Sequence, residues 1–149
     1  PDPRNVELAR LYSKEFYDLC SLKLTPNGGL ITQAGSPYYT PYAFRCIQKT
    51  MKAANYSVLP IHNQVLSMGQ WGWILGTKSK LSKETMIKRM NAINTNKITT
   101  KWLNKDAIPL ITSFGKDFYE KNKLDSIEIN QISNPVLYRY YNKGNWDVY

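Results

Sequence analysis

Three polar side chains follow a short apolar stretch in GGLITQAGSPYYTP, residues 28–41, where Gly and Pro mark a loop. Gln33 stands where the predicted strand ends, and Tyr38 and Tyr39 lie in the loop that follows. An amide oxygen accepts a hydrogen bond from an ammonium or amine N–H without adding a charge, and tyrosine joins an apolar ring to a hydroxyl. The sequence raises the question of what a glutamine and two tyrosines do at the end of a buried strand. The alternatives are a loop-anchoring amide and ordinary loop packing.

The other residues capable of chemistry are few and scattered. Asp2 lies in PDP, where an aspartate considered alone is typical of a turn. Cys20 and Cys46 lie among apolar residues of predicted helices, which favours buried thiols in a reducing compartment over a disulfide or a metal site. His62 has no Cys or His near it in the sequence, which favours a structural histidine over a metal ligand or a base. We therefore predict no metal site.

The charge of the chain is basic but dispersed. Its 149 residues carry 20 Lys and Arg against 11 Asp and Glu, for a net charge of +9 at pH 7. Such a balance is compatible with nucleic acid or an anionic membrane surface as a partner. The lysines alternate with acids and form no run of five or six, which favours an ordinary solvated surface. No signal peptide and no membrane span are expected from the sequence.

The first 78 residues predict an alternation of helices and strands. Apolar residues at three- and four-residue steps predict one amphipathic helix over residues 6–24, with Asn5 as its N-cap. A short strand, a helix from Pro41 and two further strands follow, at residues 30–32, 41–55, 56–65 and 71–77. The last two strands are separated by a short turn and are expected to pair antiparallel, and Pro60 predicts an edge or a bend. This order is typical of half of a doubly wound α/β sheet, without its Gly-rich nucleotide-binding turn.

Residues 79–149 are predicted to form a helical C-terminal extension packed on the first part. One helix is expected from Ser82 to about residue 93, and a second over residues 104–122, bent or capped near Pro109. The tail ISNPVLYRYYNKGNWDVY, residues 132–149, is rich in aromatics. Aromatic side chains can pack against a core or stack on bases, and packing is favoured because only Arg139 and Lys143 stand among them as phosphate-seeking charges.

An ordered series of motifs carries a family resemblance over residues 1–78. They read PDP, then LYSKEFYDLCSLKLTPNGGLITQAGSPYYTPYAFRCIQKTMKAANYSVLPIHNQVLSMGQWGWILGTK. This stretch resembles the C-terminal half of the polyamine aminopropyltransferases, the spermidine synthase family. It is most similar to bacterial forms whose full chains also carry membrane-spanning helices, and whose tails often contain a stretch like NPVLYRYY.

The resemblance implies an enzyme with a methyltransferase-like Rossmann sheet. Family members transfer an aminopropyl group from decarboxylated S-adenosylmethionine, a co-substrate, to putrescine or a similar diamine, with no permanently bound cofactor. The partners implied are these small molecules, the N-terminal half of the same enzyme and a second copy in a homodimer. The location implied is the cytoplasm, with the cytoplasmic domain of an inner-membrane protein as one form of it. Residues 1–149 alone are expected to be inactive.

The resemblance also assigns roles to individual residues. Asp2 matches the second aspartate of the family's D-x-x-D-P motif, which helps to hold the diamine, and is the one catalytic residue implied within this chain. The first aspartate of that motif, the general base, would stand three positions before Asp2. Gln33 matches a glutamine that faces the polyamine, and Tyr38 and Tyr39 are expected to line its methylene chain. Met68 stands where many members carry a tyrosine. The donor's adenine side would be lined by Pro3, Asn5, Val6 and Leu11.

Two other interpretations remain open at this point. One is a related Rossmann methyltransferase that uses ordinary S-adenosylmethionine, or a family member that no longer catalyses. The other, from a different class, is a basic nucleic-acid-binding module that uses the aromatic tail, with an affinity that falls steeply with salt.

Overall fold

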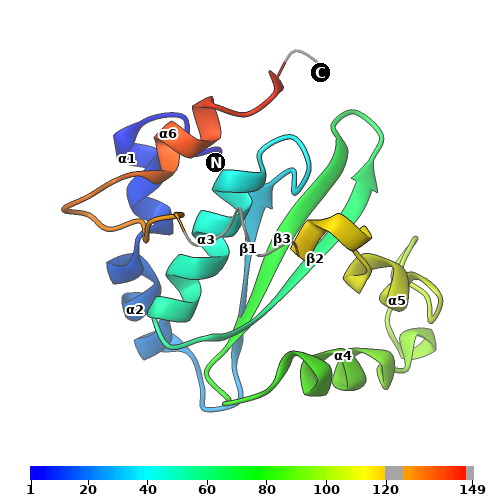
Figure 1. Cartoon of the computed structure of the whole chain (residues 1–149). Coiled ribbons are helices and arrows are strands. Elements are labelled where there is room, and N and C mark those ends of the chain that lie inside the picture. Colours follow the sequence, from blue (N-terminus) through cyan, green and yellow to red (C-terminus); the bar gives the residue numbers. More distant parts are fainter. Residues whose placement is uncertain (120–125, 147–149) are drawn as a thin grey trace.

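A three-stranded sheet forms the centre of the protein in a computed structural model that describes residues 1–119 and 126–146. Strands β1 (Gly29–Gly35), β2 (Ser57–Val65) and β3 (Gly69–Thr77) lie in the order β1-β3-β2, with β3 antiparallel to both neighbours (Figure 1). The predicted antiparallel pairing of the second and third strands is confirmed. Pro60 lies on β2, an outer strand of this sheet, where its missing N–H costs no ladder bond. The expected mixed α/β class is confirmed.

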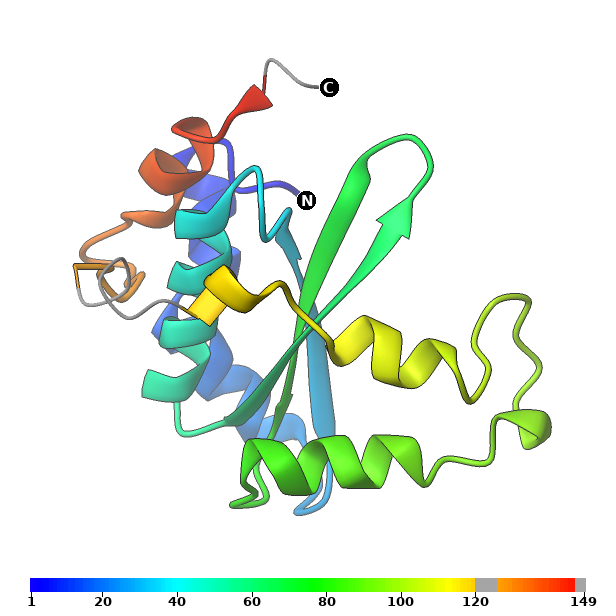
Figure 2. The same cartoon turned by 45° about the vertical axis from the view of Figure 1, so that its right-hand side comes forward.

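Helices cover the two faces of the sheet unequally. One side carries α1 (Val6–Ala9), the 3₁₀ turn η1 (Arg10–Tyr12), α2 (Lys14–Lys23), α3 (Pro41–Ala53) and α6 (Leu137–Asn142). The other side carries α4 (Lys83–Asn91) and α5 (Ala107–Thr112), with the turn η2 (Thr95–Lys97) between them along the chain (Figure 2). The turn η3 (Lys116–Tyr119) follows α5 and returns to α3, where the guanidinium of Arg45 donates to the carbonyl of Phe118. The larger core lies between the sheet and the first group, and a smaller one, built on Leu59, Ile61 and Met86, lies under α4.

The prediction of one continuous helix over residues 6–24 is wrong. Ser13 adopts an extended conformation, and its hydroxyl accepts from the N–H of Phe16 at 3.2 Å, so that a new helix begins there. Asn5 caps α1 in the same way, by accepting from the N–H of Leu8 at 2.9 Å, as expected. The segment therefore does not present one continuous apolar face. Three leucines that the helical spacing placed on that face are exposed: Leu11, Leu19 and Leu22.

Helix α3 packs closely on β3 because glycines remove the side chains between them. A Cβ atom on Gly72 would lie 2.4 Å from Cε2 of Phe44, and one on Gly76 would lie 2.5 Å from Cε of Met51. The Phe44 ring leaves no room for a side chain at residue 72, whereas Cε of Met51 is the end of a flexible side chain that can shift away from residue 76. The helix begins at Pro41, as predicted.

The C-terminal half contains less helix than its sequence pattern predicts. Helix α4 follows the expected cap, since Ser82 Oγ accepts from the N–H of Thr85 at 3.2 Å, and ends at Asn91. The helix predicted over residues 104–122 is wrong in extent: α5 ends at Thr112, and only the short η3 follows, while residues 120–122 lie outside the described part. Within residues 1–119 and 126–146, no helix combines the length and the apolar character needed to cross a membrane.

Asn130 joins the C-terminal part to the first helices. Its side chain is fully buried, with Nδ2 donating to the carbonyl of Ala9 at 2.8 Å and Oδ1 accepting from the N–H of Leu137 at 3.1 Å. Its backbone N–H donates to Oγ1 of Thr50 at 3.0 Å, and its carbonyl accepts from the N–H of Lys14 at 2.9 Å. Asn130 thus makes four hydrogen bonds, one to each of the helices α1, α2, α3 and α6.

Candidate functional site

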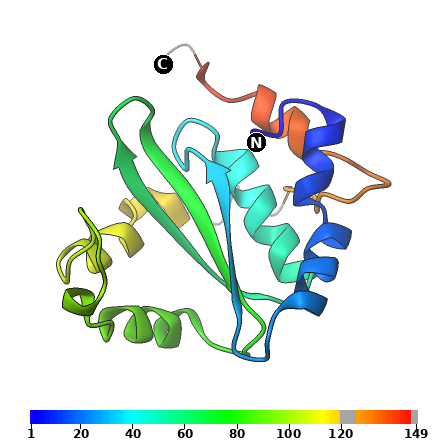
Figure 3. The same ribbon diagram turned by 180° about the vertical axis from the view of Figure 1, so that it is seen from behind.

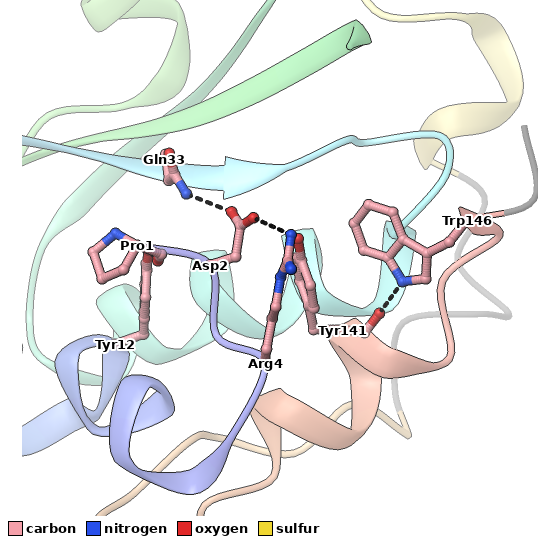
Figure 4. Close-up of polar contacts among 7 residues, drawn as sticks. All are labelled: Pro1, Asp2, Arg4, Tyr12, Gln33, Tyr141 and Trp146. Carbon is pink, nitrogen blue, oxygen red and sulfur yellow. Dashed lines mark hydrogen bonds and ion pairs between the residues drawn. The ribbon is translucent and has the colours of Figure 1, made fainter. Parts of the chain in front are cut away.

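Asp2 and Gln33, two of the residues predicted to form a site, are hydrogen bonded to each other. Gln33 Nε2 donates to Oδ1 of Asp2 at 2.8 Å, although 31 positions separate them in the chain (Figure 4). Gln33 lies near the end of β1, and Asp2 lies in the segment that enters α1. The same end of the molecule also holds α6 and the turn that joins β2 to β3 (Figure 3). The carboxyl ends of strands are the usual place for ligands in open α/β sheets.

The second oxygen of Asp2 forms a loose ion pair. Nη2 of Arg4 lies 3.4 Å from Oδ2 of Asp2, and 73% of the Arg4 side chain is exposed against 22% for Asp2. Exposed ion pairs of this kind contribute about 0–1 kcal/mol. The guanidinium can therefore move away from the carboxylate at little cost, and another cation can take its place.

Two tyrosines that were not predicted complete the surroundings of this pair. Tyr12 is buried and donates its hydroxyl proton to the carbonyl of Pro1, with Asp2 and Gln33 nearby. Burial, followed by the charge of Asp2, raises the pKa of Tyr12 to about 12. Burial and then Asp2 also raise the pKa of Tyr141, which comes from α6. Both phenols stay protonated at neutral pH and can act as donors.

The site offers one carboxylate and one amide to a ligand. The amide nitrogen of Gln33 faces Asp2. Among the residues that the structure describes, none donates a hydrogen bond to the amide oxygen, Oε1, of Gln33. Anionic and neutral acceptor oxygens side by side suit a ligand with a positive charge and N–H donors.

The two tyrosines of the β1–α3 loop point in different directions. The Tyr38 ring lies 6.2 Å from that of His62 and 6.0 Å from that of Phe118, and its hydroxyl accepts from the N–H of Gly115. Tyr39 is half-buried, and its ring lies beside Gly69 at the turn between β2 and β3. The structure therefore does not bring Tyr38 together with Asp2 and Gln33. The packing of Tyr38 is of the ordinary loop kind that the sequence left open.

The residues expected on the donor side all lie in the segment that follows Asp2. Pro3 is buried and Val6 is half-buried, while the Asn5 side chain is engaged as the cap of α1 and Leu11 is 42% exposed. Met68 lies in the turn between β2 and β3, as expected for the position where relatives carry a tyrosine. No contact in the described part joins these residues into a donor pocket.

The remaining chemically capable residues have structural surroundings. His62 is nearly buried, with Nδ1 2.7 Å from Oε1 of Gln70 and Nε2 against the carbonyl of Ser113, as expected for a structural histidine. Cys46 is buried, which raises the pKa of its thiol to about 12, and Cys20 is a free thiol as well. Within the described ranges, no group of three or more His, Cys, Asp and Glu side chains is placed to hold a metal ion.

The chain is similar to one protein family over most of its length. The family model described as the spermine/spermidine synthase domain matches residues 1–89. A polyamine aminopropyltransferase of Oceanobacillus iheyensis is 31% identical over 149 residues, which is 100% of this chain and 27% of that protein. A relative of the same description from Mycobacterium tuberculosis is 33% identical over 146 residues, 98% of this chain and 26% of that protein. The chain thus spans about a quarter of the length of these curated relatives.

The fold is also similar to a solved structure. Spermidine synthase from Thermotoga maritima superimposes with a TM-score of 0.57 at 15% identity, over 72% of this chain and 37% of that one. At this identity the likeness concerns the fold alone.

Proposed function

Because the chain belongs to the spermine/spermidine synthase family, we propose that it supplies the amine-holding part of an enzyme that transfers an aminopropyl group from decarboxylated S-adenosylmethionine to putrescine or a similar diamine. The observation that carries this proposal is the hydrogen bond between Gln33 and Asp2 at the end of β1. It brings an anionic oxygen and an amide together at the edge of the sheet where ligands of such folds bind.

The chemistry explains why the site needs these groups. The donor carbon is activated by a sulfonium, which leaves as a neutral thioether and requires no acid. The acceptor is the difficult partner, because an alkylamine has a pKa near 10.4 and is protonated at pH 7, so that freeing its lone pair costs about 4–5 kcal/mol. A carboxylate that accepts the proton while the amine is held in place lowers this cost.

Within this scheme Asp2 holds a cationic nitrogen of the diamine. The ammonium replaces the exposed guanidinium of Arg4 at the carboxylate, at the small cost typical of surface ion pairs. The amide oxygen of Gln33 accepts a second N–H of the same ligand. We assign Tyr39, beside the turn between β2 and β3, to the methylene chain of the diamine. Tyr38 reaches the same chain when the loop between β1 and α3 adjusts on ligand binding. Pro3, Asn5, Val6 and Leu11 are assigned to the adenine side of the donor.

The rest of the enzyme is proposed to pack against the first helices and β1. We propose that residues 1–78 are the C-terminal half of the Rossmann domain and that residues 79–149 are its helical extension. Leu19, Leu22 and Ile31 are exposed on α2 and β1, and together they suit an apolar partner surface. The N-terminal half of the same enzyme is that partner, and it brings the donor-binding turn and the general base. Homodimer formation and a cytoplasmic location belong to the same proposal.

A comparison of two donors tests this function. The complete protein is expected to release methylthioadenosine and form spermidine when it is given decarboxylated S-adenosylmethionine and putrescine, and to leave ordinary S-adenosylmethionine unchanged. Residues 1–149 alone, assayed in the same way, are expected to give no product, because the base and the donor-binding half are missing. Methyl transfer from the ordinary donor, or turnover by residues 1–149 alone, would contradict the proposal.

A further inference from the structure

The C-terminal part of the chain reaches the candidate site although the family-model match ends at residue 89. Residues 126–146, here called the C-terminal segment, follow a path back to the first helices and pack against α3 and α1 through α6. Nδ2 of Asn142 donates to the carbonyl of Arg4 at 3.2 Å, two residues from Asp2. The segment is therefore joined directly to the loop that carries the carboxylate.

Tyr141 is the residue of this segment that enters the site. It is 3% exposed, and its Cε2 lies 3.8 Å from where a Cβ on Gly35 would stand, at the end of β1 and two residues past Gln33. The Trp146 ring packs against it with the ring centroids 4.6 Å apart, and Nε1 of Trp146 donates to the carbonyl of Tyr141 at 2.9 Å (Figure 4). Packing on both sides fixes the orientation of the phenol.

The hydroxyl of Tyr141 is directed at the polar cluster. It lies beside Asp2 and Arg4 (Figure 4), and burial together with the nearby carboxylate raises its pKa, so that it remains a donor at neutral pH. Asp2 is therefore approached from β1, through the hydrogen bond of Gln33, and from α6, through the phenol of Tyr141. Groups on two separate, packed elements thus flank a carboxylate that stands on a short loop.

We propose that Tyr141 is a positioning residue for amine binding, which orients the Asp2 carboxylate toward the substrate from the C-terminal segment. This inference rests on the proposed function. It makes the C-terminal segment a part of the substrate site, since the phenol acts through Asp2 and need not touch the diamine itself. Hydrogen bonds to a charged group are stronger than neutral ones, and fixing an acceptor before binding removes part of the cost of ordering it.

Replacing Tyr141 by Phe in the complete enzyme tests the proposal, because it removes only the hydroxyl and keeps the packed ring. The KM for putrescine is expected to rise about tenfold, as for the loss of a hydrogen bond to a charged group, while the KM for decarboxylated S-adenosylmethionine stays unchanged. A general loosening of the fold would instead affect both substrates. Tyr138→Phe is the matched control on the same helix, because the Tyr138 hydroxyl contacts the exposed Arg139 at 3.2 Å, and it is expected to leave both constants unchanged.

A double variant checks that the phenol acts through Asp2. Once Asp2 is replaced by Asn, adding Tyr141→Phe is expected to raise the putrescine KM no more than twofold further. A putrescine KM within twofold of wild type for Tyr141→Phe, or a full tenfold effect that persists without the Asp2 carboxylate, would overturn the proposal. Absence of transfer by the wild-type enzyme would instead refute the proposed function, so the two failures are distinguishable.

Discussion

Replacing Asp2 by Asn in the complete enzyme is expected to lower kcat/KM for putrescine by about 10²- to 10³-fold, which corresponds to about 3–4 kcal/mol. Asn preserves the shape of the side chain but removes the charge that holds an ammonium. It also leaves the Arg4 guanidinium, which lies 3.4 Å from the carboxylate, without its partner and beside a cationic substrate. Charge-assisted hydrogen bonds are the stronger class, so their loss falls on the diamine and not on the donor.

The measurement is steady-state kinetics with each substrate varied in turn. Asp18→Asn is the matched control, because Asp18 pairs with Lys14 at 2.7 Å on the surface of α2 and should change neither constant. The melting temperature of both variants should stay close to that of the wild type, since the ion pairs that they lose are exposed. A rate near that of the wild type for Asp2→Asn would remove Asp2 from the site.

Replacing Asn130 by Ala is expected to lower the free energy of unfolding by about 3 kcal/mol. The substitution leaves the carbonyl of Ala9 and the N–H of Leu137 buried without their partners, which lie 2.8 and 3.1 Å away in the wild type. Each unsatisfied buried group costs about 1–3 kcal/mol. The backbone hydrogen bonds of residue 130 to Thr50 and Lys14 survive the change.

Thermal unfolding of the complete protein measures this effect, and a fall of several degrees in Tm is expected. Asn134→Ala is a suitable control, because Asn134 is an exposed residue of the same segment whose Nδ2 donates to Glu128 Oε2 at 3.2 Å. Its Tm should stay within about one degree of the wild type. Equal melting temperatures for the two variants would show that Asn130 does not join the C-terminal segment to the first helices.

The sequence predicted the elements whose signals are local. The β2–β3 pair follows from two apolar runs that are separated by a short turn, and the outer position of β2 follows from Pro60. The caps of α1 and α4, at Asn5 and Ser82, were visible because capping depends on residues three positions apart. The antiparallel pairing of β1 with β3 was not visible, because nothing in either strand encodes a partner so distant in the chain.

The wrong helix prediction has a local origin. The leucine spacing continues through Ser13, but the serine caps a new helix, and Leu19 and Leu22 are exposed. The packing of Tyr38 on His62 has no local signal, because the two residues are distant in the sequence.

Asn130 and Tyr141, which the sequence did not predict, act across long separations in the chain. Asn130 reaches Ala9 over 121 positions, and Tyr141 meets Asp2 from the opposite end of the chain. The only sequence signal for Tyr141 was the family-like stretch NPVLYRYY, which has no local property that marks a site.

A crystal structure of the complete protein with putrescine and methylthioadenosine would test the central claim most directly. One terminal nitrogen of the diamine is expected about 3 Å from a carboxylate oxygen of Asp2, with the amide oxygen of Gln33 in hydrogen-bonding range of the same ligand and Arg4 displaced. A diamine bound elsewhere, with the Gln33–Asp2 hydrogen bond and the Arg4 ion pair unchanged, would contradict it.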